Sequence, residues 1–403
     1  MKDFVPVEEA RALILDRLAP QPSERVPLAD LAGRMLAAPV VSREAIPPFD
    51  NSAMDGFAVR VEDLGTLPAV LRVTEEIPAG RHPQRRVEAG ACARIMTGAP
   101  FPEGADAVAP VEWTEPGAEG TVRFLKAPAP GQHVRRAGRD VQQGAVVVEA
   151  GAVVTPPVVG VLAMLGYAEA DAAVPPRVAV LSTGDELVDP AATPGPGQIR
   201  DSNGPSLAAQ ARHAGAAVLP PFRARDDEAA LRAALKEALE ADVLLFSGGV
   251  SVGDYDLVRQ VLDAMGMERV FWRVRQRPGK PLAYGTLRGR HVFGLPGNPV
   301  SSAMCFEQYV RPALAALLGR REVLRPRHTA HLAEPLAKKA GLYHFVRGVA
   351  AVTEEGRLQV RATGDQASNL YTSVLRANCI IHLPEALEDP PAGTAVEIEW
   401  LRW

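Results

Sequence analysis

Acidic residues, a lysine and glycine-containing turns accompany the apolar runs in the second half of this sequence. The runs 178–181, 243–246 and 291–293 are followed, in order, by Asp185 and Glu186, by Gly248 and Gly249, and by Pro296, Gly297 and Pro299, with Lys280 before the third run. Backbone N–H groups of such turns, together with a lysine, can bind phosphate. Carboxylates next to a phosphate supply the oxygen ligands that Mg²⁺ prefers, and Asp254 and Asp256 follow the second turn. The pattern predicts a site for a nucleotide or another phosphorylated ligand with Mg²⁺.

The segment 294–301 (GLPGNPVS) is the most informative of these turns. It lies between an apolar run and a helical pattern. Pro299 suits the first position of a helix, and Asn298 can cap the turn before it. A glycine-containing loop at a helix start presents free N–H groups and the positive end of the helix dipole to an anion. An ordinary turn between a strand and a helix is the alternative interpretation.

The remaining residues also have structural interpretations. Asp185 and Glu186 can cap the next segment, Asp254 can cap a helix that begins at Tyr255, and Gly248 and Gly249 can form a tight turn. A second unusual stretch, 47–58 (PPFDNSAMDGFA), has the composition of a connection between domains, in which Asp and Asn side chains form local turns. Several such features at one edge of a sheet favour a binding site.

Strand-like and helical segments alternate between residues 177 and 326. The sequence predicts strands at 178–181, 217–219, 243–246 and 291–293, and helices at 205–213, 227–241 and 255–265, with another after Pro299. This alternation predicts a parallel α/β sheet that is covered on both faces. Because ligands of such sheets bind at the carboxyl ends of the strands, the turns named above should meet at one edge.

Short β-branched runs, broken by glycine and proline, precede and follow this region. Strands are expected at 70–73, 93–96, 107–111, 122–124 and 145–148, as an all-β module, and at 346–349, 358–360, 379–383 and 395–398, as a small C-terminal β domain. Helices are predicted at 7–18, at 28–38 and at about 156–165. The last is uncharged, but it is too short for a bilayer of roughly 30 Å, and we interpret it as a buried helix.

Composition limits the classes of function. The chain of 403 residues is 47% hydrophobic and 23% charged, as expected of a folded protein with several domains. Its formal net charge of -4 argues against a nucleic-acid partner bound by a broad basic surface. Three widely spaced cysteines and the lack of a signal-peptide pattern suit a cytoplasmic protein without a membrane partner. We interpret His328 and His331 as exposed residues of a linker.

Six motifs together resemble a single family. They are 48–56 (PFDNSAMDG), 94–99 (RIMTGA), 182–187 (STGDEL), 247–253 (SGGVSVG), 278–281 (PGKP) and 294–299 (GLPGNP). In this order they resemble the MoeA family of molybdopterin molybdenumtransferases, which is related to the C-terminal domain of gephyrin. The resemblance spans nearly the whole chain.

The resemblance implies a multidomain fold of α/β and β parts. These would be a discontinuous elongated N-terminal domain at 1–55 and 149–176, an inserted β module at 56–148, a molybdopterin-binding α/β domain at 177–326 and a C-terminal β-barrel-like domain at 327–403. It further implies a homodimer whose cleft lies between the β module of one subunit and the α/β domain of the other. In that cleft, adenylylated molybdopterin and molybdate would react with Mg²⁺, so that the pterin receives molybdenum and AMP leaves.

The resemblance also assigns residues by motif position. Glu186, Asp226 and Asp256 would handle Mg²⁺ and proton transfer, although the pair Asp226 and Asp227 allows either alignment. Phosphate would be held by Lys280, Gly248 and Gly249, and the substrate would also contact Pro296, Gly297, Pro299 and Ser368. From the partner subunit, the cleft would be closed by Asp55, Thr97 and Asp140. Asp55 and Asp140 are the catalytic candidates, and Thr97 and Arg135 of the same module would bind substrate.

The C-terminal domain departs from the family pattern. Leu342 follows Gly341 where an arginine is usual, and Asp365 follows Gly364 where a serine is usual. Loss of an arginine near an anion site weakens binding. Arg347 is retained and is the candidate to compensate, and Arg277 stands where a lysine is common.

Two other functions compete with this interpretation. One is adenylylation of molybdopterin by ATP, whose enzymes share the α/β motifs but usually lack the extra β modules. The other is a non-enzymatic dimeric scaffold that binds the pterin, against which the acidic residues at the motif positions argue. Besides a second copy of the chain, the expected partners are a molybdopterin adenylyltransferase and downstream molybdoenzymes or chaperones.

Overall fold

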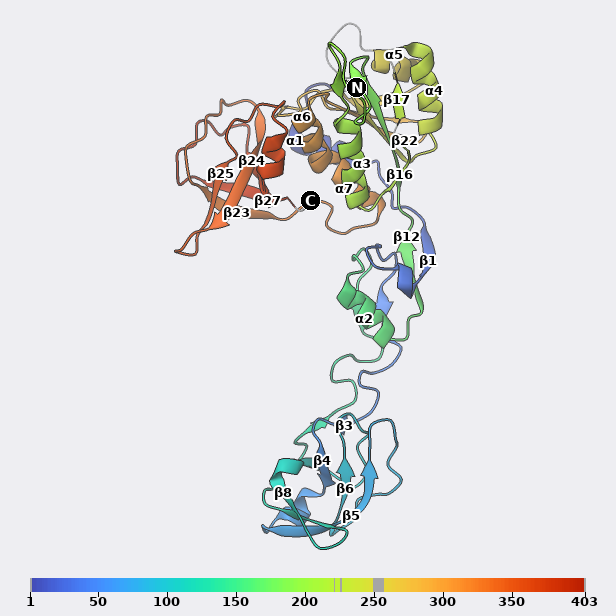
Figure 1. Cartoon of the computed structure of the whole chain (residues 1–403), viewed down its shortest axis with the longest axis vertical. Helices are drawn as coiled ribbons and strands as arrows, with labels where there is room; N and C mark the ends of the chain where they lie inside the picture. Colours follow the sequence, from blue (N-terminus) through green and yellow to red (C-terminus); the bar gives the residue numbers. More distant parts are fainter. Residues whose placement is uncertain (1, 221, 225–226, 249–256, 402–403) are drawn as a thin grey trace. The chain divides into compact units, whose positions relative to one another are not determined.

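The computed structural model describes residues 2–220, 222–224, 227–248 and 257–401 (Figure 1). The chain forms two compact units. The first comprises Met1–Ala38, Ala150–Pro156 and Glu169–Trp403, and the second comprises Pro39–Glu149 and Pro157–Ala168. Each unit is therefore built from segments that lie far apart in the sequence.

A six-stranded sheet forms the centre of the second unit. Its order is β7-β4-β6-β5-β9-β8, in which β5 and β6 are parallel and the other neighbours antiparallel. Side chains alternate between the faces of a strand, so Phe57 and Val59 pack in one buried cluster and Ala58 in another. The strands are β4 (Gly56–Val59), β5 (Ala69–Ile77), β6 (Ala91–Ile95), β7 (Ala107–Pro110), β8 (Thr114–Pro116) and β9 (Thr121–Phe124).

Shorter elements surround this sheet. The run predicted as a strand at 145–148 forms β11 (Val146–Val148), but it pairs with β2 (Val40–Val41) and lies outside the six-stranded sheet. The predicted helix at about 156–165 is α2 (Pro156–Met164), in which Leu162 alone is buried. The prediction of a buried helix is therefore wrong for the single chain. The other elements are β3 (Asn51–Ser52), β10 (Val134–Arg135), η2 (Val61–Leu64) and η3 (Val111–Trp113).

The segment 28–38 is extended, although the sequence predicts a helix there. Leu28–Asp30 forms one short 3-10 helix, η1, and Gly33 then takes a positive φ of 82°, which ends the helical geometry. Gly33 N donates to the carbonyl of Val154, and Leu36 N donates to that of Ala152. The helix prediction is wrong because these backbone groups pair with a distant segment. Next to it, β1 (Ser23–Pro27) pairs with β12 (Glu169–Ala173).

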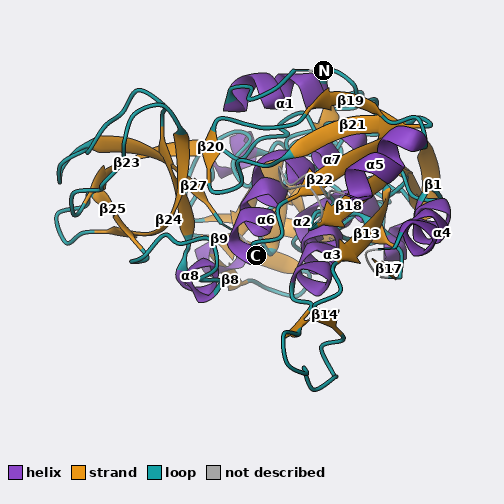
Figure 2. Cartoon of the chain, turned by 90° about the horizontal axis from the view of Figure 1, so that it is seen from above, coloured by secondary structure: helices purple, strands orange, loops and turns teal. Residues whose placement is uncertain are grey.

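The larger sheet of the first unit has the order β16-β13-β18-β22-β21-β19, and β17 also pairs with β13 (Figure 2). Four helices, α1, α3, α6 and α7, cover one face, and α4 and α5 cover the other. The strands are β13 (Arg177–Thr183), β16 (Ala217–Val218), β17 (Phe222–Ala224), β18 (Val243–Ser247), β19 (Glu268–Phe271), β21 (Ala283–Leu287) and β22 (Arg290–Leu295). The helices are α1 (Val7–Leu15), α3 (Asn203–His213), α4 (Glu228–Ala238), α5 (Leu257–Ala264), α6 (Pro299–Cys305) and α7 (Arg311–Leu317).

One strand corrects the prediction of a wholly parallel sheet. β21 runs antiparallel to both of its neighbours, β22 and β19. A two-residue turn, Arg288 and Gly289, joins β21 to β22, with φ values of 51° and 78°. Positive φ at both positions is the geometry of a type I′ hairpin. The alternation of strands and helices does not predict this edge of the sheet.

The C-terminal strands close into a five-stranded barrel, which Figure 2 shows as a ring. Around the ring the order is β24-β25-β23-β27-β26, and β26 pairs again with β24. His328 and His331 lie on β23, which corrects their assignment to a linker, although both are exposed as expected. The strands are β23 (Arg327–Leu332), β24 (Tyr343–Val352), β25 (Leu358–Ala362), β26 (Cys379–Leu383) and β27 (Ala395–Trp400).

Small elements border the two domains of this unit. β20 (Gln276–Arg277) leaves the α/β region and pairs in parallel with the start of β24. β14 (Leu187–Val188) pairs with β15 (Ile199–Arg200), and α8 (Thr372–Arg376) lies between β25 and β26 in the sequence. The barrel is therefore attached to the α/β domain by a shared strand as well as by the chain.

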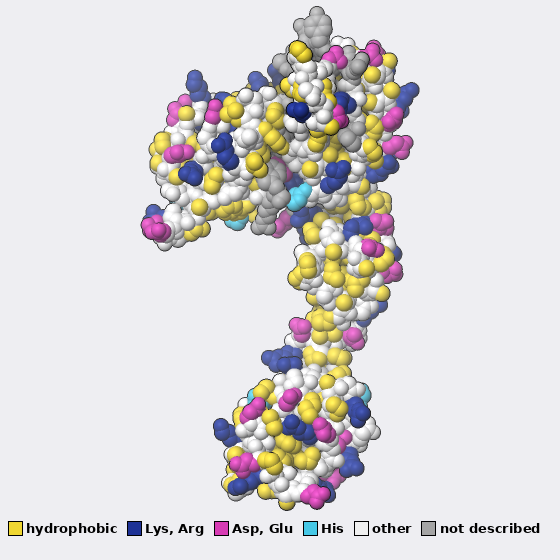
Figure 3. Space-filling view, viewed as in Figure 1, with side chains coloured by type: hydrophobic (Ala, Val, Ile, Leu, Met, Phe, Trp, Pro, Cys, Tyr) yellow, Lys and Arg dark blue, Asp and Glu magenta, His cyan; other side chains and the backbone are white. Residues whose placement is uncertain are grey.

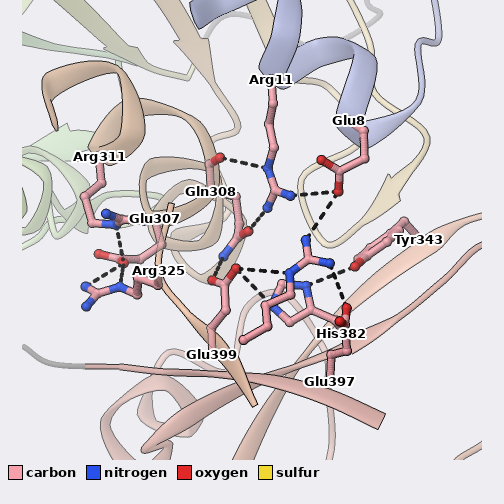
Figure 4. Close-up of polar contacts among 11 residues, drawn as sticks. Glu8, Arg11, Glu307, Gln308, Arg311, Arg325, Tyr343, His382, Glu397 and Glu399 are labelled. Carbon is pink, nitrogen blue, oxygen red and sulfur yellow. Dashed lines mark hydrogen bonds and ion pairs between the residues drawn. The ribbon is translucent and has the colours of Figure 1, made fainter. Parts of the chain in front are cut away.

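A buried polar network also joins the barrel to the α/β domain (Figure 4). Gln308 lies in a π-helical turn, Phe306–Val310, between α6 and α7. Its side chain accepts from Arg11 of α1 and donates to Glu399 of β27 at 2.9 Å, and Glu399 contacts His382 at 3.3 Å. Burial opposes the charge of Glu399, but His382, Gln308 and Arg11 outweigh it and lower the pKa of Glu399 to about 2. Charge-assisted hydrogen bonds thus hold the barrel in place.

The surface mixes both signs of charge. On the face drawn in Figure 3, Lys and Arg side chains are interspersed with Asp and Glu. Each helix in the described part of the chain falls short of the length and apolar character needed to cross a bilayer.

The substitution Gly56→Ala tests how tightly β4 packs in the second unit. A Cβ atom at this position would lie 2.1 Å from the carbonyl oxygen of Ala109 on β7. We expect Gly56→Ala to lower the free energy of unfolding by about 1–3 kcal/mol, the usual cost of overpacking a core. Urea denaturation followed by circular dichroism measures this change.

Gly160→Ala is the matched control in the same unit. Gly160 lies within α2, and an added Cβ would meet nothing within 4 Å. Because alanine favours a helix, this variant should gain roughly 0.5–1 kcal/mol. Equal losses of stability in both variants would show that contact with Ala109 is not what limits position 56.

Candidate functional site

The register of the sheet brings four loops to one edge. Ser182 of β13 pairs with Ser247 of β18, which in turn pairs with Leu295 of β22. β21 runs the opposite way, so its first residue, Ala283, pairs with Gly294. The loops after β13, β18 and β22 and the loop before β21 therefore start at the same edge. They contain Glu186, Gly248, Lys280, Pro296 and Gly297, and Pro299 begins the helix that follows the last of these residues.

Two of these loops approach each other through bare backbone. Gly248 has a positive φ of 95°, and a Cβ there would lie 2.9 Å from the carbonyl oxygen of Thr183. Its N–H donates to the carbonyl of Leu295 at 3.3 Å. A Cβ on Gly297 would lie 3.8 Å from the Cα of Gly248. The glycines thus allow the ends of β13, β18 and β22 to lie close together, with peptide groups in place of side chains.

The start of α3 adds polar residues that our sequence interpretation missed. Asn203 Nδ2 donates to Ser247 Oγ at 2.8 Å and to the carbonyl of Gly297 at 2.7 Å. Asp201 is buried and accepts a hydrogen bond from Gly204 N at 2.9 Å. The signal for these residues is the polar run 200–203 (RDSN) directly before the helix predicted at 205–213; in the structure that helix already begins at Asn203.

Two buried hydroxyl groups lie at the end of β13. Ser182 Oγ and Thr183 Oγ1 lack a hydrogen-bond partner among the described residues. Buried polar groups are nearly always hydrogen-bonded, so an unpaired pair requires an explanation such as a bound polar ligand or water. Their position at the edge shared with Gly248 makes them part of the candidate site.

The loop before α6 contacts the barrel. Pro299 occupies the first turn of α6 as predicted, but the side chain of Asn298 makes no capping hydrogen bond. Asn298 Nδ2 instead donates to Ser368 Oγ at 3.0 Å, and Val300 N donates to the carbonyl of Ser368 at 3.2 Å. Ser368 therefore lies at this edge, held by the residues around Pro299.

The structure bears on two pairs of acidic residues, Asp185 with Glu186 and Asp226 with Asp227. Asp185 and Glu186 directly precede β14, so the next segment, which they were expected to be able to cap, is a strand. Glu186 is exposed, and its carboxylate turns back toward Gly184, where a Cβ would lie 2.5 Å from Glu186 Oε2. Asp227 does cap a helix, because its Oδ1 accepts from Ala230 N at 2.8 Å. That structural role favours Asp226 over Asp227 as the site residue.

Several predicted site residues lie outside the described residues. These are Asp226, Gly249 and Asp256, as well as Asp254 with its alternative role as a helix cap. Across the described ranges, no three His, Cys, Asp or Glu residues gather closely enough to hold a metal ion. The predicted metal ligands therefore include one described residue, Glu186.

In the second unit, Asp55 is held by Thr97. Asp55 Oδ1 accepts from Thr97 N at 2.7 Å and from Thr97 Oγ1 at 2.8 Å. These two hydrogen bonds, backbone first, lower the pKa of the exposed Asp55 carboxyl, and the charge of Arg94 adds to them. Asp55 lies just before β4 and Thr97 just after β6, so the pairing of these neighbouring strands brings the two residues together. Asp55 is thus kept ionised by donors that point at one of its oxygens.

Hydrogen bonds hold the loop that contains Asp140 against the stretch 46–50. Asp140 N donates to the carbonyl of Ile46 and Gly138 N to that of Pro47, each at 2.9 Å. Asp50 lies in the motif 48–56 but received no role in the predicted site. It accepts hydrogen bonds from Ala137 N at 2.8 Å and from Arg136 Nη1 at 2.5 Å. Burial raises the pKa of Asp50, but these two donors outweigh it and lower the pKa.

The stretch 47–58 is therefore more than a connection between domains. It supplies β3 and β4, and Asn51 of β3 pairs with Arg135 of β10. Arg135 and Asp140 are both exposed. Backbone pairings within the second unit therefore position four of the predicted site residues, Asp55, Thr97, Arg135 and Asp140.

Arg347, the candidate to compensate for Leu342, is buried in the barrel. Its Nη2 donates to the carbonyls of Asp365 and Ala367 at 3.3 Å, whereas its Nε and Nη1 have no hydrogen-bond partner among the described residues. Burial lowers the pKa of Arg347 to about 10, partly opposed by the charge of Asp365. Arg347 thus holds the loop before Ser368, and its compensation for Leu342 stays a prediction.

Family models match the chain in three consecutive parts. "MoeA N-terminal region (domain I and II)" matches residues 5–166, "Probable molybdopterin binding domain" matches residues 179–316, and "MoeA C-terminal region (domain IV)" matches residues 329–401. Together these matches extend over most of both units.

Whole proteins match over nearly the full length. The chain is 38% identical over 396 residues to the "Molybdopterin molybdenumtransferase" of Haemophilus influenzae, which covers 98% of each chain. It is also 38% identical over 404 residues to "Molybdopterin molybdenumtransferase 2" of Mycobacterium tuberculosis, which covers 97% of this chain and 98% of that one. The crystal structure of the molybdopterin biosynthesis moeA protein from Pyrococcus horikoshii OT3 superposes with a TM-score of 0.85 at 29% identity, covering 99% of this chain and 100% of that chain.

The pKa of Asp55 should depend on the Thr97 hydroxyl. In Thr97→Val the backbone donor remains and the Oγ1 donor is lost, so the pKa of Asp55 should rise toward its usual value. The carboxylate would then protonate at a higher pH than in the wild type. An NMR titration of the Asp55 carboxyl carbon measures the shift. Thr97→Ser keeps the donor and should titrate like the wild type, whereas a similar rise in both variants would assign the effect to packing.

Proposed function

The chain belongs to the MoeA family, and on that premise we propose that it is a molybdopterin molybdenumtransferase. In this reaction, molybdenum from molybdate enters adenylylated molybdopterin and AMP is released. The observation that carries the proposal is the edge formed by Gly248, Gly297 and the hydroxyls of Ser182 and Thr183, which have no hydrogen-bond partner in the described part of the chain. Bare peptide groups and hydroxyls at strand ends suit a phosphorylated, polar ligand.

The residues of this edge divide into two proposed roles. Lys280, Gly248 and Gly249 hold phosphate, because an ammonium group and backbone N–H groups stabilise its negative charge. The substrate also contacts Pro296, Gly297, Pro299 and Ser368, and Asn203 keeps the Gly297 turn in place through its hydrogen bond to the Gly297 carbonyl. We include Asp201 and Asn203 in the proposed site because they contact Gly204, Ser247 and Gly297 at this edge.

Mg²⁺ is the metal that the proposed reaction implies. The described donors at the end of β13 are oxygens, the carboxylate of Glu186 and the hydroxyls of Ser182 and Thr183, and this hard donor chemistry fits the ion. Glu186, Asp226 and Asp256 would hold it, and it would supply positive charge against the phosphate that AMP carries away. The same three carboxylates would also accept or donate the protons of the reaction.

The competing functions are not favoured. An adenylyltransferase would need the α/β domain alone, whereas the family models and the similar whole proteins extend across the second unit and the barrel. A scaffold without catalysis would not need the carboxylates of Glu186 and Asp55.

Glu186→Ala tests the reaction. With adenylylated molybdopterin, molybdate and Mg²⁺, the wild type should release AMP and yield metal-loaded pterin, and the variant should lose about 100-fold or more in turnover. Because Glu186 is exposed, the thermal midpoint of the variant should stay within about 1–2 °C of the wild type. No AMP release by the wild type would reject the function, and equal losses of turnover and stability would make Glu186 a structural residue.

We further propose that the active form is a homodimer whose cleft combines Glu186 of one subunit with Asp55 of the other. Membership of the family supports a dimer, and the uncharged helix α2, in which Leu162 alone is buried, is available for a contact between subunits.

Mixed dimers test that arrangement. Asp55→Ala and Glu186→Ala should each be inactive alone. In a random mixture, half of the dimers are mixed, and each mixed dimer rebuilds one intact cleft, so about a quarter of wild-type activity should return. A mixture that stays inactive after exchange of subunits would place both residues in a cleft within one chain. A chain that sediments as a monomer under assay conditions would reject the dimer itself.

A further inference from the structure

A buried amide holds the loop that carries Lys280. Gln276 is 1% exposed, and its Nε2 donates to the carbonyl oxygens of Pro278 and Gly279, each at 3.1 Å. The same nitrogen contacts Cys305 Sγ of α6 at 3.4 Å. One side chain therefore binds the two residues immediately before Lys280.

Tyr309 holds the other end of this amide. It is also 1% exposed, and its hydroxyl donates to Oε1 of Gln276. The carbonyls of Pro278 and Gly279 can only accept hydrogen bonds, so the nitrogen of Gln276 faces them and its oxygen faces the Tyr309 hydroxyl. Loss of that hydroxyl would leave the buried Oε1 unpaired, which is costly, so Tyr309 stabilises the amide in the place from which it binds the loop.

The loop is packed against α6 without spare room. Gly279 has a positive φ of 87°, and a Cβ there would lie 2.4 Å from Cys305 Sγ and 2.8 Å from Gln276 Nε2. The carbonyl of Lys280 accepts from Val274 N at 3.0 Å, which closes the base of the loop. The backbone from 278 to 280 is therefore fixed by several contacts at once.

The π-helical turn directs Tyr309 to this place. A π turn adds a residue to the helical turn and rotates the side chains that follow it. In Phe306–Val310, Gln308 binds Arg11 and Glu399 of the network in Figure 4, while Tyr309 binds Gln276. The same helical segment begins at Pro299, next to the Gly297 turn. It therefore relates the position of the Gly297 turn to that of the Lys280 loop.

We propose that Gln276 and Tyr309 are positioning residues for phosphate binding by Lys280. The Lys280 side chain is exposed, and its Nζ lies 5.1 Å from the centre of the Phe4 ring. Because this long side chain is flexible, the location of its backbone decides which phosphate it reaches. The inference rests on the proposed function, in which Lys280 binds phosphate. Neither Gln276 nor Tyr309 touches the substrate.

Tyr309→Phe is the first test, because it removes one hydroxyl without changing the shape of the ring. The probe is AMP with Mg²⁺, and the measurement is its Kd by calorimetry, together with KM and kcat for the full reaction. We expect Lys280→Ala to raise the Kd about tenfold and Tyr309→Phe to raise it about threefold to fivefold. In Lys280→Ala, adding Tyr309→Phe should cause no further change, because the two act through the same contact.

Tyr284→Phe is the matched control. Tyr284 is equally buried, but its hydroxyl contacts His291 Nδ1 at 3.0 Å, away from the loop. It should lower the thermal midpoint about as much as Tyr309→Phe and leave the Kd unchanged. Gln276→Met, similar in size and without hydrogen bonds, should reproduce the effect of Tyr309→Phe on Kd.

The outcomes separate the two proposals. Weak AMP binding by Lys280→Ala with normal binding by Tyr309→Phe and Gln276→Met would overturn the positioning role and leave the proposed function standing. An effect of Tyr309→Phe that persists in Lys280→Ala would also overturn it. Normal binding by Lys280→Ala would reject phosphate binding by Lys280 itself, and the positioning role with it.

Discussion

The shared register of β13, β18 and β22 is the constraint on which the candidate site depends. Parallel strands in register end at one edge, so residues that are more than a hundred positions apart, such as Ser182 and Leu295, become neighbours through Ser247. At such an edge the peptide groups of the following loops have no strand partner and must find others. Gly248 and Gly297 let these loops come together without side chains between them. A ligand with many acceptor oxygens suits the surface that results.

A second feature is that one helical segment serves both domains of the first unit. The segment from α6 to α7 begins at the edge of the sheet, and its π turn points Gln308 toward the barrel and Tyr309 toward the Lys280 loop. Buried hydrogen bonds of this kind are directional, and they are costly to leave unmade. They therefore favour one arrangement of barrel, helix and loop over others that apolar packing alone would allow.

Much of the fold follows from local patterns. The apolar runs at 178–181, 243–246 and 291–293 are buried strands, and Pro299 begins a helix. Failures occur where distant backbone decides the structure. The segment 28–38 pairs with 152–154 instead of forming a helix, and β21 turns back on β22 through Arg288 and Gly289. His328 and His331 lie in a strand because β27 pairs with their segment.

The sequence by itself determined which chemical groups are available: the turns with Gly248 and Gly297, the lysine at 280, and the acidic residues at 55 and 186. It also indicated that the strand-end groups share one edge, since parallel strands require it. Tertiary structure alone decided what those groups are bound to. Asn203 on the Gly297 turn, Thr97 on Asp55 and Tyr309 on Gln276 all contact partners in other elements of their unit. Hydrogen-bond partners of this kind depend on distances between separate elements, which short-range patterns along the chain do not encode.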